Sequence, residues 1–162
     1  MSDIGYITYV LNSSDAGANP YTPDANNPNS DFVCTLAEPL NLPGSWECCL
    51  VSATFQNPVS PPASVLIFLD ILDDSSVGNN SLPFLYNTRT IHVGDQTPST
   101  IEHLTTILQW KPVRRTHTQN IRVTLQDSKG NWLPGPNPGP PPFIPTPTTV
   151  QFILRQVSSQ AR

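Results

Sequence analysis

Hydrophobic and polar residues alternate along several short stretches of the chain, with turn-forming residues between them. The alternation is clearest in "IRVTLQD" (121–127), where Ile121, Val123 and Leu125 fall on one face. A period of two is typical of a β-strand, whose successive side chains point to opposite faces. The same reasoning predicts strands over 4–12, 31–40, 46–56, 64–72, 82–93, 121–127 and 148–157.

Two of these predicted strands indicate which side chains face the interior. In the stretch 31–40, Phe32, Cys34 and Leu36 share one face. The stretch "SVLIFLDIL" (64–72) is almost entirely apolar. We therefore expect 64–72 to be covered on both faces or to lie at an interface.

The segment "STIEHLTTILQW" (99–110) fits two kinds of structure. Ser99 and Glu102 have the spacing of a helix capping box, and the apolar residues that follow recur at helical intervals. Its threonines and Ile107 are equally suited to a strand from about 104 to 110. Both a short helical turn and a strand remain open.

This order of elements predicts an all-β protein. About eight strands without intervening helices indicate a single jelly-roll β-sandwich of antiparallel strands. An immunoglobulin-like sandwich is the alternative, but Cys34, Trp46 and Cys48 are too close together for its Cys…Trp…Cys spacing. We expect one domain, 1–162, with a proline-rich surface loop at about 133–147, because proline lacks the N–H that a sheet requires.

Composition and charge exclude several classes of function. Charged residues make up 12% of the chain and the net charge is −4. The only basic cluster, "KPVRRTH" (111–117), is interpreted as a solvated loop, so we expect no nucleic-acid partner. No apolar run reaches the length of a membrane span. Three cysteines, an odd number, favour a reducing compartment over a disulfide framework.

The adjacent cysteines Cys48 and Cys49 are the first candidates for chemistry. Because they are neighbours in a predicted strand, their side chains point to opposite faces and cannot share a metal ion. We interpret them as small hydrophobic residues that pack on the two faces of that strand.

The other polar residues form no catalytic pattern. The three histidines lie in separate segments, and none has a second ligand at i+2 or i+4. Asp73 and Asp74 follow a predicted strand and are expected to bond backbone N–H groups in a turn rather than to bind calcium with Asp70. Glycine-rich phosphate-binding patterns are missing. We therefore predict no enzyme, no cofactor and no metal site.

Six blocks of sequence carry a resemblance to a known family. They are "YVLNSSD", "LAEPLNLPGSWECCLVSATFQNP", "IFLDILDDSSVGNNSLPFL", "WKPV", "IRVTLQDSKGNWLP" and "VQFILR". In this order they resemble the penton, or minor capsid, protein of Polinton/Maverick elements and virophages. The likeness covers nearly the whole chain. The link from Phe55 to Val65 is shorter than in that family, and the proline-rich insertion at 134–147 is longer.

The resemblance implies a structural protein of an icosahedral capsid. Five copies would form the pentameric vertex beside a double-jelly-roll major capsid protein, with a fibre or host receptor as a further partner. The protein would be found in the virion, at the capsid vertex, after assembly in the cytoplasm or nucleus of the host cell. The structural anchors implied by the resemblance are Trp46, Leu50, Asp70, Val77, Gly78, Trp110, Pro112, Asp127 and Gly130.

Two other functions are compatible with the same pattern of strands. A jelly-roll carbohydrate-binding or attachment module would stack sugar rings on Trp132, Phe143 and Tyr86. A cupin-like enzyme would need a cluster of histidines inside the barrel.

Overall fold

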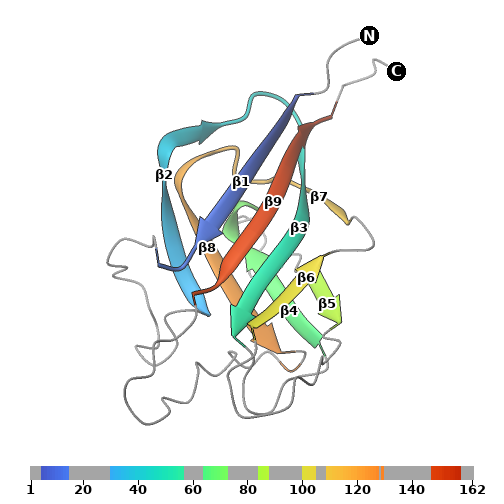
Figure 1. Cartoon of the computed structure of the whole chain (residues 1–162). Helices are drawn as coiled ribbons and strands as arrows, with labels where there is room; N and C mark the ends of the chain where they lie inside the picture. Colours follow the sequence, from blue (N-terminus) through green and yellow to red (C-terminus); the bar gives the residue numbers. More distant parts are fainter. Residues whose placement is uncertain are drawn as a thin grey trace, which may run out of the picture.

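In a computed structural model the chain forms two antiparallel β-sheets that face each other as a β-sandwich, which confirms the predicted all-β sandwich (Figure 1). The structure describes residues 5–14, 30–56, 64–72, 84–87, 100–104, 109–127, 129 and 147–157. The elements are β1 (Tyr6–Asn12), β2 (Asp31–Asn41), β3 (Trp46–Gln56), β4 (Ser64–Leu69), the 3-10 helix η1 (Asp70–Leu72), β5 (Phe84–Asn87), β6 (Thr100–Leu104), β7 (Trp110–Pro112), β8 (His117–Asp127) and β9 (Thr149–Gln156).

The chain passes repeatedly from one sheet to the other. The first sheet has the order β1-β9-β3-β6, with the short strand β7 also paired to β3. The second sheet has the order β2-β8-β4-β5. The first and last described strands are therefore neighbours, and Tyr6 of β1 lies opposite Arg155 of β9. Among the described strands, β1 and β2 are edge strands on the same side of the sandwich (Figure 1).

The core fills the space between the inner faces of the two sheets. Ile121, Val123 and Leu125 of β8 are buried there, as the alternation of the sequence predicted. The buried residues Phe32, Cys34 and Leu36 of β2 belong to the same core. In β9, Val150, Phe152 and Leu154 are also completely buried. A period of two on the facing strands thus produces one continuous apolar layer.

The start of β3 depends on a glycine turn. Gly44 has a φ of +85°, a conformation that residues with a Cβ rarely adopt. The turn directs Trp46 into the core, where 8% of its surface is exposed, and its Nε1–H donates a hydrogen bond to the Pro43 carbonyl at 3.0 Å. Leu50 is buried four residues later, just before a bulge in the pairing with β9.

The predicted strand 64–72 is too long by one turn. β4 ends at Leu69, and the next three residues form η1 instead. The Asp70 side chain explains the change, since its Oδ1 accepts a hydrogen bond from the backbone N–H of Arg122 at 3.0 Å. A side chain thereby takes a β8 donor at the end of the β4–β8 ladder, and the chain leaves the sheet.

Other boundaries also differ from the predicted ones. In place of a single strand from 104 to 110, the segment 99–110 contains β6 and the first residue of β7; residues 105–108 lie outside the described part. β8 begins at His117, four residues before the predicted start. The basic cluster 111–117 is not one loop, because Lys111 belongs to β7 and His117 to β8. Within the predicted strand 82–93, the described strand covers four residues.

The structure describes only part of the chain as regards membrane-spanning helices. In that part of the chain no helix has the length and apolar character needed to cross a bilayer.

Candidate interaction surfaces

The two adjacent cysteines lie on opposite faces of β3, as predicted. Cys48 belongs to the core between the sheets, whereas Cys49 points to the outer face of the first sheet. Cys49 is nevertheless only 1% exposed. In the register of the sheet, Trp110 of β7 and Ile153 of β9 flank it on the two sides. None of the three cysteines takes part in a disulfide.

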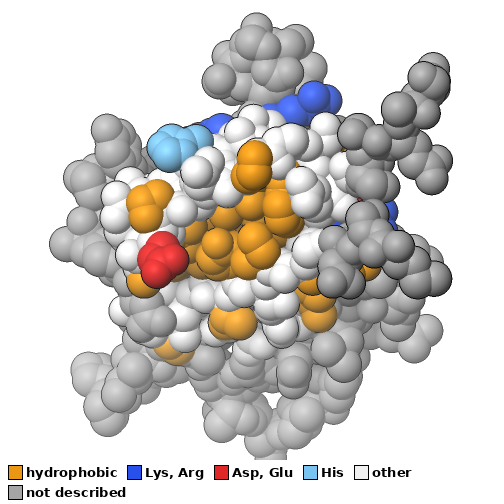
Figure 2. Space-filling model, turned by 90° about the horizontal axis from the view of Figure 1, so that it is seen from above, with side chains coloured by type: hydrophobic (Ala, Val, Ile, Leu, Met, Phe, Trp, Pro, Cys, Tyr) orange, Lys and Arg blue, Asp and Glu red, His pale blue; other side chains and the backbone are white. Residues whose placement is uncertain are grey.

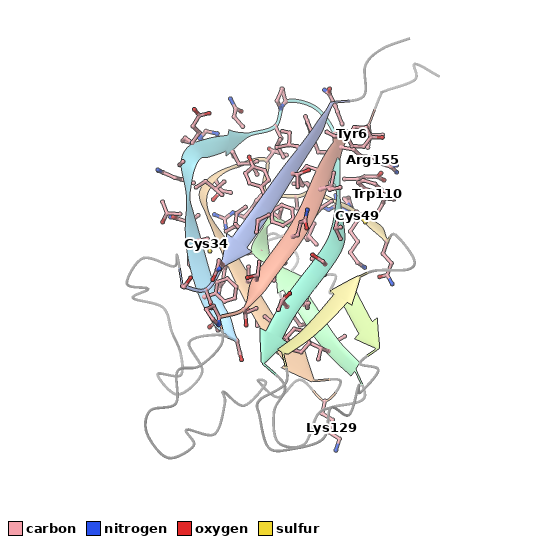
Figure 3. The ribbon with its side chains drawn as sticks, in the orientation of Figure 1. Tyr6, Cys34, Cys49, Trp110, Lys129 and Arg155 are labelled. Carbon is pink, nitrogen blue, oxygen red and sulfur yellow. The ribbon has the colours of Figure 1, made fainter. Side chains whose placement is uncertain are left out.

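An aromatic and charged cluster covers this outer face. The Arg155 guanidinium lies 3.9 Å from the centre of the Trp110 ring. Its Nε and Nη2 groups both donate hydrogen bonds to Oε2 of Glu47, at 2.9 and 2.6 Å. Figure 3 shows Cys49, Trp110 and Arg155 together at one end of the sheet, with Tyr6 beside them. We call Glu47, Trp110 and Arg155 the outer cluster.

The environment of the two thiols makes them poor nucleophiles. Burial raises the pKa of the Cys48 thiol far above its ordinary range, and the neighbouring Cys49 raises it further. Burial also raises the pKa of Cys49, although a hydrogen bond with the Gln109 backbone and the charge of Arg155 act in the opposite direction. Because the thiolate is the reactive form, both cysteines are packing groups at neutral pH.

A second group of charges lies on the outer face of the other sheet. Arg122 makes a two-point ion pair with Asp31, with both nitrogen-to-oxygen distances at 2.7 Å. Asp31 is only 3% exposed. Asp70 binds the Arg115 guanidinium and the backbone N–H of Arg122. These contacts join the start of β2, the end of β4 and the middle of β8.

A groove of about 470 Å³ separates the edge strands β1 and β2. We call it the β1 groove; it is lined by residues 9–12 and 34–38. At one end, the Cys34 thiol donates a hydrogen bond to the Asn12 carbonyl at 3.4 Å. Of the lining residues that the structure describes, Glu38 alone has a charged side chain. Burial raises the pKa of Tyr9, and the charge of Glu38 raises it further. The β1 and β2 walls of the groove therefore interact electrostatically.

The upper end of the molecule combines apolar and acidic character. Figure 2 shows hydrophobic side chains gathered near the centre of this face, with an acidic side chain at their margin and basic side chains farther away. β2 bends at this end (Figure 1). The bend coincides with a shift of register between Thr35 and Leu40, so residues 36–39 have no counterpart in the pairing with β8.

The residues implied by the family resemblance lie in several places. Trp46 and Leu50 lie in the core, Asp70 lies in η1, and Trp110 and Pro112 lie in β7. Asp127 ends β8, where its backbone pairs with Val65. The remaining anchors, Val77, Gly78 and Gly130, lie outside the described residues, as do Trp132, Phe143 and His92.

The described residues include no cluster of histidine, cysteine and acidic side chains of the kind that a metal site requires. Within the described ranges, no group of three or more histidine, cysteine or acidic side chains is placed to hold a metal ion. Tyr86 lies in β5 and His103 in β6, and the structure describes only the backbone there.

The sequence reasoning missed the outer cluster and the β1 groove. The outer cluster depends on pairing among β3, β7 and β9, which no local pattern reveals. The groove had one signal, because the Glu38-Pro39 pair in β2 combines a charge with a proline, and both are typical of edge strands.

Scans of the chain against protein-family models and against curated proteins gave no match.

Proposed function

We propose that the chain is a structural capsid protein that forms the pentameric vertex, or penton, of an icosahedral particle. The observation that supports this proposal best is the order of the strands. When the short β7 is set aside, eight strands remain in two four-stranded sheets with the orders β1-β9-β3-β6 and β2-β8-β4-β5. Such alternation between two facing sheets is expected of a jelly roll, an architecture that viral capsid proteins share with lectin domains and cupins.

Within jelly rolls, the six blocks that resemble the penton family favour the capsid function. Low charge agrees with it, since only 12% of the residues are charged. Four charged side chains on the outer faces form ion pairs within the chain, Glu47 with Arg155 and Asp31 with Arg122. Tyr6 and Val10, which point outward from β1, are each 60% exposed. Surfaces with neutralised charges and exposed apolar side chains are suited to burial between subunits.

The mechanism of a vertex protein is geometric. A ring needs one patch of each copy to contact a different patch of the next copy, with a rotation that closes at five. A standard interface of this kind buries about 800 Å² on each partner. Individually moderate contacts give a stable assembly when the ring and the shell are both closed, because each subunit is then held by several contacts at once.

The proposal is tested by measuring mass and position in a particle. We expect native mass spectrometry, alone or with a double-jelly-roll major capsid protein, to give five times the 17.7 kDa of the chain. Electron microscopy of co-assembled particles should place density for the chain at the five-fold vertices. Dimers as the largest species, together with empty vertices, would contradict the proposal.

A further inference from the structure

We propose that the β1 groove binds an extended segment of a partner protein, rich in β-branched residues and carrying lysine or arginine, as an added strand of the first sheet. This binding activity goes beyond the proposed vertex function and does not depend on it. It rests on three features: the orientation of the β1 backbone, the shape of the β2 wall and the charge of Glu38.

The backbone of β1 presents hydrogen-bonding groups toward the groove. Residues of an antiparallel pair alternate between those bonded to the neighbouring strand and those directed away from it. The Gly5 carbonyl accepts from the Gln156 N–H at 3.2 Å, and the Ser13 N–H donates to the Thr148 carbonyl at 2.8 Å. The odd-numbered residues between them therefore face β9, and the N–H and C=O groups of Tyr6, Thr8 and Val10 face the opposite side.

A direct observation agrees with this assignment. The carbonyl of Asn12, an even-numbered residue, accepts the hydrogen bond from the Cys34 thiol across the groove. The N–H and C=O groups of Val10 lie on the same side of β1 within the groove, and those of Thr8 lie on that side just beyond the lining residues. An exposed strand edge of this kind is a template for another strand.

The β2 wall leaves space for such a strand. Residues 36–39 of β2 have no counterpart in β8, and the strand bends there, away from a regular ladder (Figure 1). The 470 Å³ of the groove is within the range of peptide and ligand sites. A strand paired to β1 would place alternate side chains between Tyr9 and Leu36 and the others beside Tyr6 and Val10, which are exposed. Apolar or β-branched residues therefore fit on both of its faces.

Charge complementarity decides between a partner and a second copy. Glu38 places one negative charge at the rim of an otherwise uncharged set of lining residues. A second copy of β1, with the sequence YITYVLN, has no cation to place opposite it. An extended segment of another protein that contains lysine or arginine can bond to the backbone groups at the edge of β1 and can also pair its cation with Glu38.

The test selects ligands without assuming their sequence. A display library of random twelve-residue peptides is selected on the immobilised full chain, and enriched peptides are measured by fluorescence anisotropy. We expect enrichment of alternating valine, isoleucine or threonine with at least one lysine or arginine. Hydrogen exchange by NMR should show new protection of the Thr8 and Val10 amides when such a peptide binds.

Matched variants locate the site. Thr8→Pro removes an N–H on the groove side of β1, next to the lining residues, but leaves the β9 ladder intact, so we expect about tenfold weaker binding, the loss of one hydrogen bond. Glu38→Gln should weaken binding about threefold, as for an exposed ion pair. Gln109→Lys changes the net charge by the same amount at an exposed position just before β7, outside the groove, and should leave binding unchanged.

Each alternative outcome would overturn the proposal. No enrichment, enrichment of acidic peptides, or full affinity in both Thr8→Pro and Glu38→Gln would exclude an added basic strand. Self-association that Thr8→Pro abolishes would show that a second copy is the occupant. Circular dichroism checks that Thr8→Pro folds; if it does not, the pair Glu38→Gln and Gln109→Lys decides the question together with amide exchange.

Discussion

Cys48 and Cys49 show, at the scale of single residues, how a strand gives two identical side chains different surroundings. Cys48 is enclosed by the core, and Cys49 is enclosed on the outer face beside Trp110 and Ile153. In both places burial raises the pKa of the thiol. Two adjacent cysteines suggest redox or metal chemistry when only the sequence is read. In a strand, however, their side chains point to opposite faces and cannot act together.

The raised pKa of Cys48 predicts that the protein loses stability in alkaline solution. An unfolded thiol releases its proton at about pH 8.5, whereas native Cys48 keeps it. The native state then binds more protons, so the free energy of unfolding is constant for this group below about pH 8.5 and falls above it. We expect a loss of about 1.4 kcal/mol from Cys48 between pH 7.5 and pH 9.5, measured by urea unfolding with a reductant.

The Cys48→Ala variant is the control for this prediction. It is less stable at every pH because it leaves a small cavity in the core. Its decline from pH 7.5 to 9.5 should be smaller than that of the original chain by the contribution of one thiol. Equal declines in the two proteins would show that Cys48 ionises in the native state.

At the scale of strands and helices, a side chain can take the place of a backbone acceptor at the end of a strand pair. Asp70 is the main example, because it follows β4, starts η1, binds β8 through Arg122 and binds the segment before β8 through Arg115. The backbone N–H groups of Arg114 and Arg115 also donate to the Ile71 carbonyl, at 2.8 and 3.0 Å. η1 therefore holds the segment that leads from β7 into β8.

Two substitutions of Asp70 separate its backbone contact from its ion pair. Asp70→Ala removes the acceptor for the Arg122 N–H, and we expect the free energy of unfolding to fall by about 2 kcal/mol. Asp70→Asn keeps an Oδ1 acceptor and loses only the pairing with Arg115, which is 44% exposed, so we expect a loss of about 0.5 kcal/mol. Chemical denaturation measures both. An asparagine variant as unstable as the alanine variant would show that the ion pair dominates.

Local pattern predicted those elements in which burial alone decides the structure. The bounds of β3 were predicted from Trp46 to Gln56, and the inward residues of β8 and β2 were predicted correctly. The errors lie where distant partners compete with the local preference. Asp70 ended a strand by binding a backbone group 52 positions away, which an apolar run cannot indicate. The outer cluster arises in the same way, since Arg155 and Glu47 are 108 positions apart.

At the scale of the whole molecule, the first described strand closes the sandwich against the last. β1 contributes Ile7, Tyr9 and Leu11 to the inner layer, and the Tyr9 ring stacks on Phe152 with centroids 5.4 Å apart. Full burial of a side chain such as Leu11 contributes about 1.5–3 kcal/mol, and the partly buried Ile7 and Tyr9 contribute less. Together the three are a substantial share of the stability of a small domain, about 5–15 kcal/mol.

Removal of residues 1–13 should therefore unfold or loosen the whole sandwich. We expect the shortened chain to bind a dye specific for exposed apolar surface and to lose its near-ultraviolet circular dichroism. A separate peptide of residues 1–13 should restore the signal, because it can occupy the vacant place beside β9 with the register of the intact chain.

Two proline-containing peptides test this register. In a Tyr9→Pro peptide the missing N–H is one that faces β9, so restoration should fail. In a Thr8→Pro peptide the missing N–H faces away, and restoration should be retained. The reverse result would show that β1 pairs with β9 through its even-numbered residues.

The burial of all three cysteines has a practical consequence for spectroscopy. Thiol-specific dyes and spin labels react with accessible thiolates, and the folded chain offers none of its native cysteines to them. A Gln119→Cys substitution, at an exposed site of β8, would introduce one accessible thiol without removal of the native ones. Single labels at chosen positions could then report distances between subunits in solution or in an assembled particle.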